Sequence, residues 1–349
     1  MIVPKYYEDL HVLHKNTMPD RAYYIPASVK MDGSVETREQ SDRFVQLSGQ
    51  WKFCYYDSIY DAKEEFWKEG SDLQGFDQVV VPGVWQNYGY DRHQYTNTRY
   101  PFPMDPPYVP HQNPCGEYIR TFTYYKDERA PKAFLNFEGV DSCFYVWVNG
   151  SFAWYSQVSH STSEFDVTHL LQEGENTLAV LVLKWCDGSY LEDQDKFRMS
   201  GIFRDVYLLR RPEEGIFDFF VKAQPSKDYS EGEVEILLHY QKEFARTKAS
   251  LYDRDGRLAA EGEAVRRQTD AEREEGRGAQ GEVSLQVKEA RLWNAEDPYL
   301  YTLVLETEGE VITDQVGIRE IHVEDGVVYL NGVKGKFHGT NRHASDPVT

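Results

Sequence analysis

The chain has 349 residues, with 38 lysines and arginines against 58 aspartates and glutamates, so its formal net charge is −20. This length predicts two or three domains. The negative charge is not offset by any Lys- or Arg-rich stripe, so nucleic acid and anionic membrane surfaces are excluded as expected partners. No segment reaches the roughly 18 apolar residues of a membrane span. The opening residues lack the apolar core of a signal peptide, and we therefore expect a cytoplasmic protein.

The first part of the chain predicts an arm followed by a β-sandwich. Residues 1–44 set prolines among aromatic residues, which indicates an irregular arm laid over the next domain. In residues 45–212, short apolar and aromatic runs alternate with Gly, Pro, Asn and Asp, as is typical of an antiparallel jelly-roll. Within it, Asn149-Gly150 predicts a tight hairpin turn. Only residues 60–70 are predicted to be helical, from their helix-favouring side chains.

The second part predicts another sandwich. Residues 213–323 contain six or seven further alternating segments, which indicate an immunoglobulin-like fold. Residues 265–282 carry almost no apolar side chains, and we expect them to form a mobile loop. A second Asn-Gly pair, Asn331-Gly332, predicts a hairpin at the start of residues 324–349.

A polar cluster between two apolar strands, residues 185–205, is the first candidate site. It contains four carboxylates: Asp187, Glu192, Asp193 and Asp195. Residue chemistry leaves two interpretations open. The cluster is either a surface loop with ion pairs and turn caps, or a loop that offers Asp195 to a hydroxylated ligand or a hard cation. Nearby aromatic rings suit the second interpretation, because they can stack on the apolar faces of sugars. Asn97 and His343 are open to the same choice between structural and functional roles.

Several common kinds of catalytic and cofactor site find no support in the sequence. There is no Gly-x-Ser-x-Gly elbow for acyl transfer, no glycine-rich phosphate loop and no HExxH metal motif. The four cysteines lie far apart without a CxxC pair, so we expect isolated buried thiols.

Five stretches of the chain resemble the N-terminal half of the glycoside hydrolase family 2 β-galactosidases. They are WCDGSYLEDQDKFRMSGIFRDVYLL, MDPPYVPHQNPCGEY, NFEGVDSCFYVWVNG, SEFDVTHLLQEGENTLAVLVLKW and FHGTNRHASDP. The resemblance implies a mainly β chain: a galactose-binding-like jelly-roll and an immunoglobulin-like sandwich, followed by a (β/α)₈ barrel. A barrel needs roughly 250 residues. Residues 324–349 would supply only its first strand, so the resemblance implies a truncated fragment.

The resemblance also implies an activity for the parent protein. Retaining β-galactosidases hydrolyse terminal non-reducing β-D-galactosides such as lactose, using two glutamates about 5–5.5 Å apart. In the family both glutamates come from later barrel strands. No catalytic residue is therefore assigned in this chain, and we expect the chain alone to be inactive. The implied partners are the galactoside substrate and the missing C-terminal catalytic domains, within a homo-oligomeric parent.

The resemblance assigns ligand contacts residue by residue. Asn97 is similar to an asparagine that binds sugar hydroxyls, and Asp195 to an aspartate that holds Na⁺ near the galactose 6-hydroxyl. His343 is similar to a histidine that contacts the sugar. A Mg²⁺ site is also implied, with four ligands: Gln157, Asp187, Asp9 and the carbonyl of Val12. The chain departs from the family at Tyr6 and Ala344, where acidic residues are common.

Two alternatives remain open at this level. The chain is either a stand-alone carbohydrate-binding or interaction module, or a fragment of a β-glucuronidase or β-mannosidase relative. A stand-alone module should end at a finished strand near Val323, whereas the sequence continues into FHGTNRHASDP. The segment LEDQDKFRMSGIFRDV argues against a β-glucuronidase or a β-mannosidase, because it resembles the galactosidase branch more than either of them.

Overall fold

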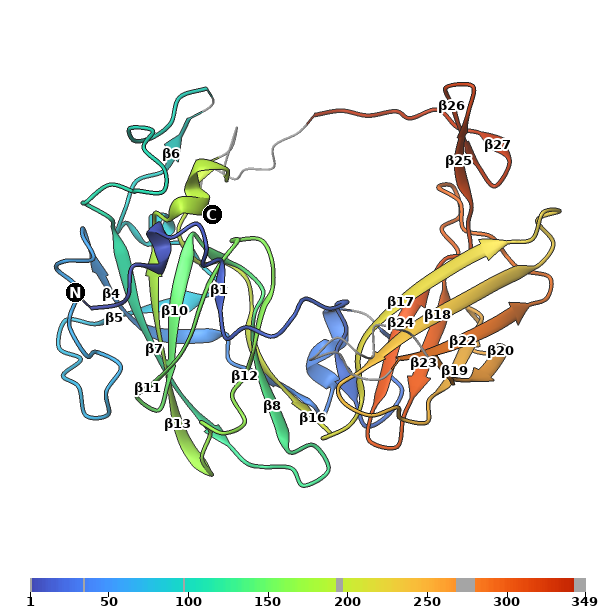
Figure 1. Cartoon of the computed structure of the whole chain (residues 1–349), viewed down its shortest axis with the longest axis horizontal. Helices are drawn as coiled ribbons and strands as arrows, with labels where there is room; N and C mark the ends of the chain where they lie inside the picture. Colours follow the sequence, from blue (N-terminus) through green and yellow to red (C-terminus); the bar gives the residue numbers. More distant parts are fainter. Residues whose placement is uncertain (1, 34, 97, 193–196, 268–279, 342–349) are drawn as a thin grey trace.

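Two sheets that face each other form the first sandwich (Figure 1). The computed structural model describes residues 2–33, 35–96, 98–192, 197–267 and 280–341. The larger sheet has the order β1-β11-β10-β13-β7-β4-β5 and the smaller β12-β8-β16-β3. The strands of the larger sheet are β1 (His14–Lys15), β4 (Gly49–Tyr56), β5 (Asp77–Val81), β7 (Cys115–Tyr124), β10 (Cys143–Val148), β11 (Ser151–Gln157) and β13 (Gly174–Leu183). Those of the smaller sheet are β3 (Phe44–Gln46), β8 (Lys132–Phe137), β12 (Ser163–Asp166) and β16 (Val206–Arg211).

Successive side chains along each strand point to opposite faces of the larger sheet, and both of these faces are buried. One face packs on the smaller sheet through side chains such as Trp51, Phe137 and Val180. The other face is covered by the N-terminal arm and by the loop after β4, where Tyr7 and Phe66 join the core. Near-continuous apolar runs such as residues 143–148 follow from this burial on both sides.

A second pair of sheets forms an immunoglobulin-like sandwich, as predicted. Its sheets have the orders β17-β18-β22-β21 and β2-β24-β23-β19-β20. Their strands are β2 (Pro26–Ala27), β17 (Ile216–Pro225), β18 (Gly232–Tyr240), β19 (Lys248–Tyr252), β20 (Leu258–Glu263), β21 (Val265–Arg267), β22 (Gln280–Val287), β23 (Tyr301–Glu306) and β24 (Val311–Val316). Ile236, Leu251 and Leu303 are fully buried between the two sheets. The loop predicted at residues 265–282 is wrong at both ends, because β21 and β22 pair there, with Val265 opposite Glu282. Its middle, residues 268–279, lies outside the described residues.

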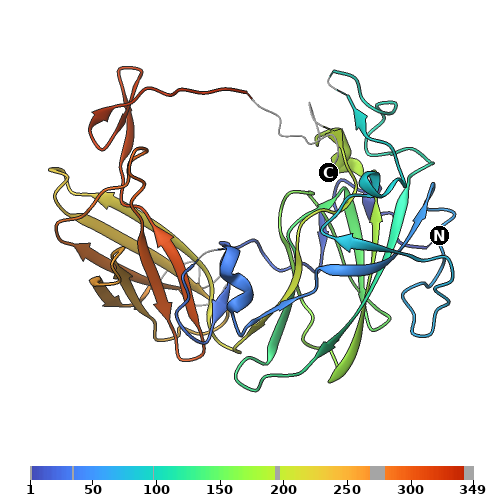
Figure 2. The ribbon, with the colours of Figure 1, turned by 180° about the vertical axis from the view of Figure 1, so that it is seen from behind.

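Short elements decorate the two sandwiches. The remaining strands are β6 (Gln94–Tyr95), β9 (Val140–Asp141), β14 (Phe197–Arg198), β15 (Gly201–Ile202), β25 (Ile321–Glu324), β26 (Val327–Leu330) and β27 (Val333–Lys334). The 3₁₀ turns are η1 (Tyr6–Glu8), η2 (Val35–Gln40), η3 (Trp85–Tyr88) and η4 (Asp187–Tyr190). The two sandwiches lie side by side, with β6, η4 and the β25–β27 sheet at the same end of the molecule (Figures 1 and 2).

Both Asn-Gly hairpins are confirmed. Asn149 and Gly150 have φ angles of 49° and 78° between β10 and β11, and Asn331 and Gly332 have φ angles of 48° and 74° between β26 and β27. Residues 335–341 then continue without regular secondary structure. The barrel strand implied by the resemblance therefore stays a prediction.

The predicted helix at residues 60–70 is wrong, because this segment consists of isolated turns. Glu65 has a left-handed φ of 63°, which an α-helix does not allow. Phe66 is fully buried against Trp147, at a ring-centroid distance of 5.6 Å. A segment this short gains little from helix propensity, so the packing of its aromatic residues determines its path.

Candidate functional site

The strand pair β6–β14 joins the two loops singled out in the sequence. Tyr95 lies directly opposite Phe197, and Gln94 lies opposite Arg198. The rings of Tyr95 and Phe197 are 6.0 Å apart and meet edge to face, while His93 contacts Phe197 at the same distance. Tyr95 and Phe197 are 51% and 45% exposed, so both rings offer apolar surface to a ligand.

Each strand of this pair is close in sequence to a predicted sugar-binding residue. Asn97 follows Tyr95 by two residues, and Asp195 precedes Phe197 by two residues. Asn97, Asp195 and His343 themselves lie outside the described residues, so their contacts stay predictions. What the structure brings together is the pair of segments that carries Asn97 and Asp195.

Buried polar and aromatic groups hold the loop that carries β14 in place. Arg198 is 5% exposed, and its guanidinium donates to the carbonyls of Ser189 and Glu192 at 3.4 and 3.1 Å. The Tyr190 hydroxyl donates to the carbonyl of Tyr108, and Tyr100 donates to the carbonyl of Tyr190 at 3.0 Å. Sequence reasoning did not identify these supports, because carbonyl acceptors leave no sequence signal.

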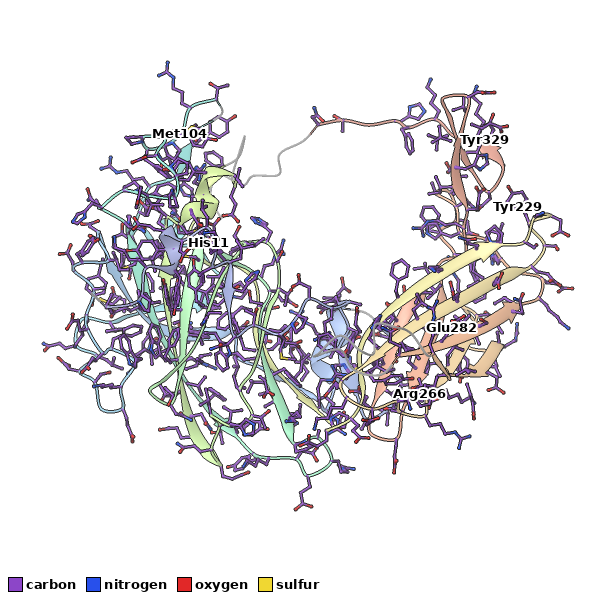
Figure 3. All side chains as sticks on the ribbon, in the orientation of Figure 1. His11, Met104, Tyr229, Arg266, Glu282 and Tyr329 are labelled. Atoms are coloured by element: carbon purple, nitrogen blue, oxygen red, sulfur yellow. The ribbon has the colours of Figure 1, made fainter. Side chains whose placement is uncertain are left out.

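The predicted magnesium ligands converge beside η4, where the arm crosses the end of the first sandwich. Gln157 ends β11, and its amide nitrogen donates to the carbonyl of Val12 at 3.3 Å. Asp187 begins η4 and is 6% exposed. Asp9 precedes Val12 on the arm and accepts a hydrogen bond from the backbone of His11 at 3.0 Å. Figure 3 shows His11 at this end of the sandwich, with Met104 on the β6 loop.

The electrostatics of this cluster fit a hard cation. Burial raises the pKa of Asp187, and the negative charge of Asp9 raises it further, although a hydrogen bond from Gln157 opposes the rise. The side-chain oxygen of Gln157 is buried without a hydrogen-bond partner. Two carboxylates, an amide oxygen and a carbonyl form an all-oxygen donor set of the kind that Mg²⁺ prefers. A divalent cation would remove the repulsion and satisfy the unpaired oxygen.

Tyr6, where the family often has an acid, does not extend this donor set. Its ring packs against Tyr145 and Tyr155 at centroid distances of 6.2 and 5.5 Å. Within the described ranges, no three His, Cys, Asp or Glu side chains gather at a metal-binding distance. The cluster would therefore hold a cation with two carboxylates and neutral oxygens.

Comparison with protein families identifies both sandwiches. Residues 44–212 match the sugar binding domain of the glycosyl hydrolases family 2, and residues 215–319 match a second model of the same family. The chain belongs to glycoside hydrolase family 2. Among the described residues, no helix of this family member is long and apolar enough to cross a membrane.

Named relatives of this family 2 chain are β-galactosidases. It is 45% identical to the β-galactosidase of Actinobacillus pleuropneumoniae over 100% of its own length and 32% of that protein. It is 42% identical to the enzyme of Staphylococcus xylosus, over 100% of the chain and 33% of that protein. The chain thus spans about a third of the length of the curated relatives it matches.

Solved structures share the fold of this family 2 chain. The β-glucuronidase of Bifidobacterium dentium, complexed with coumarin-3-O-glucuronide, superposes with a TM-score of 0.62 at 18% identity, covering 83% of this chain and 50% of that one. A β-glucuronidase from an uncultured Clostridium sp. gives a TM-score of 0.63 at 20% identity, with coverage of 89% and 49%. At this identity the likeness concerns the fold.

Proposed function

We propose that this chain is the N-terminal portion of a retaining β-galactosidase, an enzyme that hydrolyses terminal β-D-galactosides such as lactose. The observation that carries the proposal is the 45% identity to a named β-galactosidase along the entire chain. The β6–β14 pair supports it, because it joins the segments of Asn97 and Asp195 beside exposed aromatic rings. The two catalytic glutamates would lie in the remaining two thirds of the parent.

In this proposal the chain orients the sugar and does not cleave it. The loops of the first sandwich would hold the galactose hydroxyls through Asn97, and Asp195 would bind Na⁺ beside them. His343 would contact the sugar from the barrel side. Because a site divided between domains loses most of its walls when one is missing, the chain alone should bind galactose weakly and hydrolyse nothing.

The decisive experiment compares the chain with its full-length parent. The parent should hydrolyse a chromogenic β-galactoside much faster than the matching β-glucuronide or β-mannoside, and purified residues 1–349 should hydrolyse none of them. Preference for a glucuronide or a mannoside would support the alternative relatives. Tight, saturable galactose binding by the chain alone, measured by calorimetry, would support a stand-alone carbohydrate-binding module.

We also propose that Asp9, Asp187, Gln157 and the carbonyl of Val12 hold Mg²⁺. Support comes from the unpaired amide oxygen of Gln157 and from the mutual repulsion of the two carboxylates. When bound, the ion would supply structural charge neutralisation between the arm and the sandwich. The ligands lie on the arm, on β11 and on η4, so occupancy would fix the arm against the first sandwich.

We also propose that the parent protein is cytoplasmic and homo-oligomeric. All four cysteines are free and three are buried, which fits a reducing compartment. Fractionation of the source cells and light scattering of the full-length enzyme would test the two points separately.

A further inference from the structure

The N-terminal arm crosses between the two sandwiches twice. It leaves the first sandwich where the Met18 amide donates to the carbonyl of Glu164, at 2.8 Å. It then adds β2 to the second sandwich, with Pro26 opposite Ile312 and Ala27 opposite Val311. It finally returns to the first sandwich as β3. Counting the linker of residues 212–215, three stretches of backbone span the junction.

The outgoing part of the arm is bound to both sandwiches by polar groups. Arg21 forms a two-pronged ion pair with Glu164 of the first sandwich, at 2.9 and 2.7 Å. One residue later, the amide of Ala22 donates to Asp218 of the second sandwich at 2.7 Å. The hydroxyl of Tyr24 donates to the carbonyl of Ile216, also in the second sandwich, at 2.7 Å.

A buried ion pair spans the same junction independently of the arm's backbone. Arg211, the last residue of β16, donates to both carboxylate oxygens of Glu310, at 3.1 and 2.6 Å. Both residues are almost fully buried, at 1% and 2% exposure. Tyr24 lies over the guanidinium at 5.1 Å, and the amide of Ile216 donates to Glu310 at 3.2 Å. The charges at the junction are therefore paired and hydrogen-bonded, as buried charges must be.

The returning part of the arm is anchored in the same way. The Met31 amide donates to the hydroxyl of Thr313 on β24, at 3.0 Å. Arg38 of η2 then binds Glu138 at 2.7 Å and also pairs with Asp205, both in loops of the first sandwich. Each crossing thus has at least one anchor on either side of the junction.

We propose that residues 18–33 and 35–43 form an interdomain strap that fixes the angle between the two sandwiches. Domains joined by a single linker move relative to each other by default. Here the three backbone crossings and the Arg211–Glu310 pair oppose that motion. The strap keeps the β6–β14 end of the first sandwich at a constant position relative to the β25–β27 sheet, which extends from the second (Figure 1). This inference does not depend on the proposed sugar or on any metal.

Distance measurements between the sandwiches test the strap. Spin labels would be placed on the chain at Tyr125→Cys and Leu258→Cys, which are exposed sites on the first and second sandwich, with Cys54→Ser removing the least buried thiol. Double electron–electron resonance should give one narrow distance distribution. Ala27→Asp places a charge at a 1% exposed position on β2 and should at least double the width of that distribution. Val29→Asp, at a 65% exposed position two residues away, should leave it narrow.

Two outcomes would overturn the proposal. One is a broad distribution in the labelled chain without further substitution. The other is a narrow distribution in Ala27→Asp when circular dichroism shows that both sandwiches are folded. If Ala27→Asp does not fold, the labelled chain without this substitution still tests the proposal, because a broad distance distribution there would overturn it. Because no sugar enters the experiment, its failure leaves the proposed β-galactosidase function unaffected.

Discussion

Tyr56 donates a hydrogen bond to Glu117 at 3.3 Å, from one strand of the seven-stranded sheet to the next. Glu117 is fully buried, and its second carboxylate oxygen has no hydrogen-bond partner. Burial raises the pKa of this carboxyl from 4.5 to about 8, although Lys63 and Tyr56 partly oppose the rise. The chain therefore folds around a carboxyl group that is mostly protonated at neutral pH.

Glu117→Gln should remove a pH dependence of stability. Between pH 4.5 and 8 the folded chain retains a proton that the unfolded chain has released, so the free energy of unfolding falls as pH rises through this range. A shift of one pKa unit corresponds to about 1.4 kcal/mol. The free energy of unfolding of Glu117→Gln, relative to that of the wild type, should therefore increase by about 3 to 5 kcal/mol as the pH rises from 4.5 to 9. Urea denaturation across this range measures the effect. Glu175→Gln, at an exposed position on β13, is the control; equal slopes for Glu117→Gln and wild type would contradict the prediction.

Magnesium should stabilise the chain through Asp187. A ligand that binds only the folded state raises the free energy of unfolding, and a hundredfold excess over Kd adds about 2.7 kcal/mol. We expect Mg²⁺ to raise the midpoint of thermal unfolding by a few degrees in wild type and not in Asp187→Ala. Asp228→Asn, at an exposed site in the second sandwich, should respond like wild type. The same shift in Asp187→Ala would place the ion elsewhere.

Phe197→Ala should weaken substrate binding by the parent enzyme. The exposed ring would lose its contact with the apolar face of a sugar, at a cost of about 1 kcal/mol, which corresponds to a roughly fivefold higher KM. Steady-state kinetics with a chromogenic β-galactoside would measure the change. Tyr125→Ala removes a 66% exposed ring remote from β14 and should leave KM unchanged. An unaltered KM in Phe197→Ala would exclude the ring from the sugar site.

The turn at Asn149 allows a matched pair of substitutions. Its amide donates to the carbonyl of Leu170 and to Asn176, both at 2.8 Å, and its φ of 49° is left-handed. Asn149→Ala should lose both the hydrogen bonds and the favourable conformation, at a total cost of about 2 to 3 kcal/mol. Asn149→Gly should lose only the hydrogen bonds and be less destabilised. Denaturant unfolding of the two variants would show whether the backbone contributes, and equal losses would show that it does not.

Features that depend on neighbouring residues were predictable from the sequence. Asn149-Gly150 and Asn331-Gly332 both form hairpin turns, because the left-handed conformation is a property of those residues themselves. The alternation of apolar residues likewise gave the two sandwiches, since burial on one face of a strand has a period of two. The predicted resemblance to family 2 was confirmed for a different reason, because it depended on several long segments that all resemble the same family.

Features that depend on distant residues were not predictable. The helix expected at residues 60–70 gave way to turns, because Phe66 packs against Trp147, about 80 residues away. The path of the arm depends on strand partners nearly 290 residues distant, which no local pattern reveals. The metal site and the three sugar contacts all stay predictions, although Gln157 does donate to the carbonyl of Val12 and interacts with Asp187.

The β2 strand also has a consequence for how this protein behaves among its own copies. β2 is the outermost strand of its sheet and covers the open side of β24. Pro26 has no amide hydrogen to offer a further strand. The arm thus closes an edge that would otherwise invite intermolecular β-pairing, and removing it would leave β24 open as a template for aggregation.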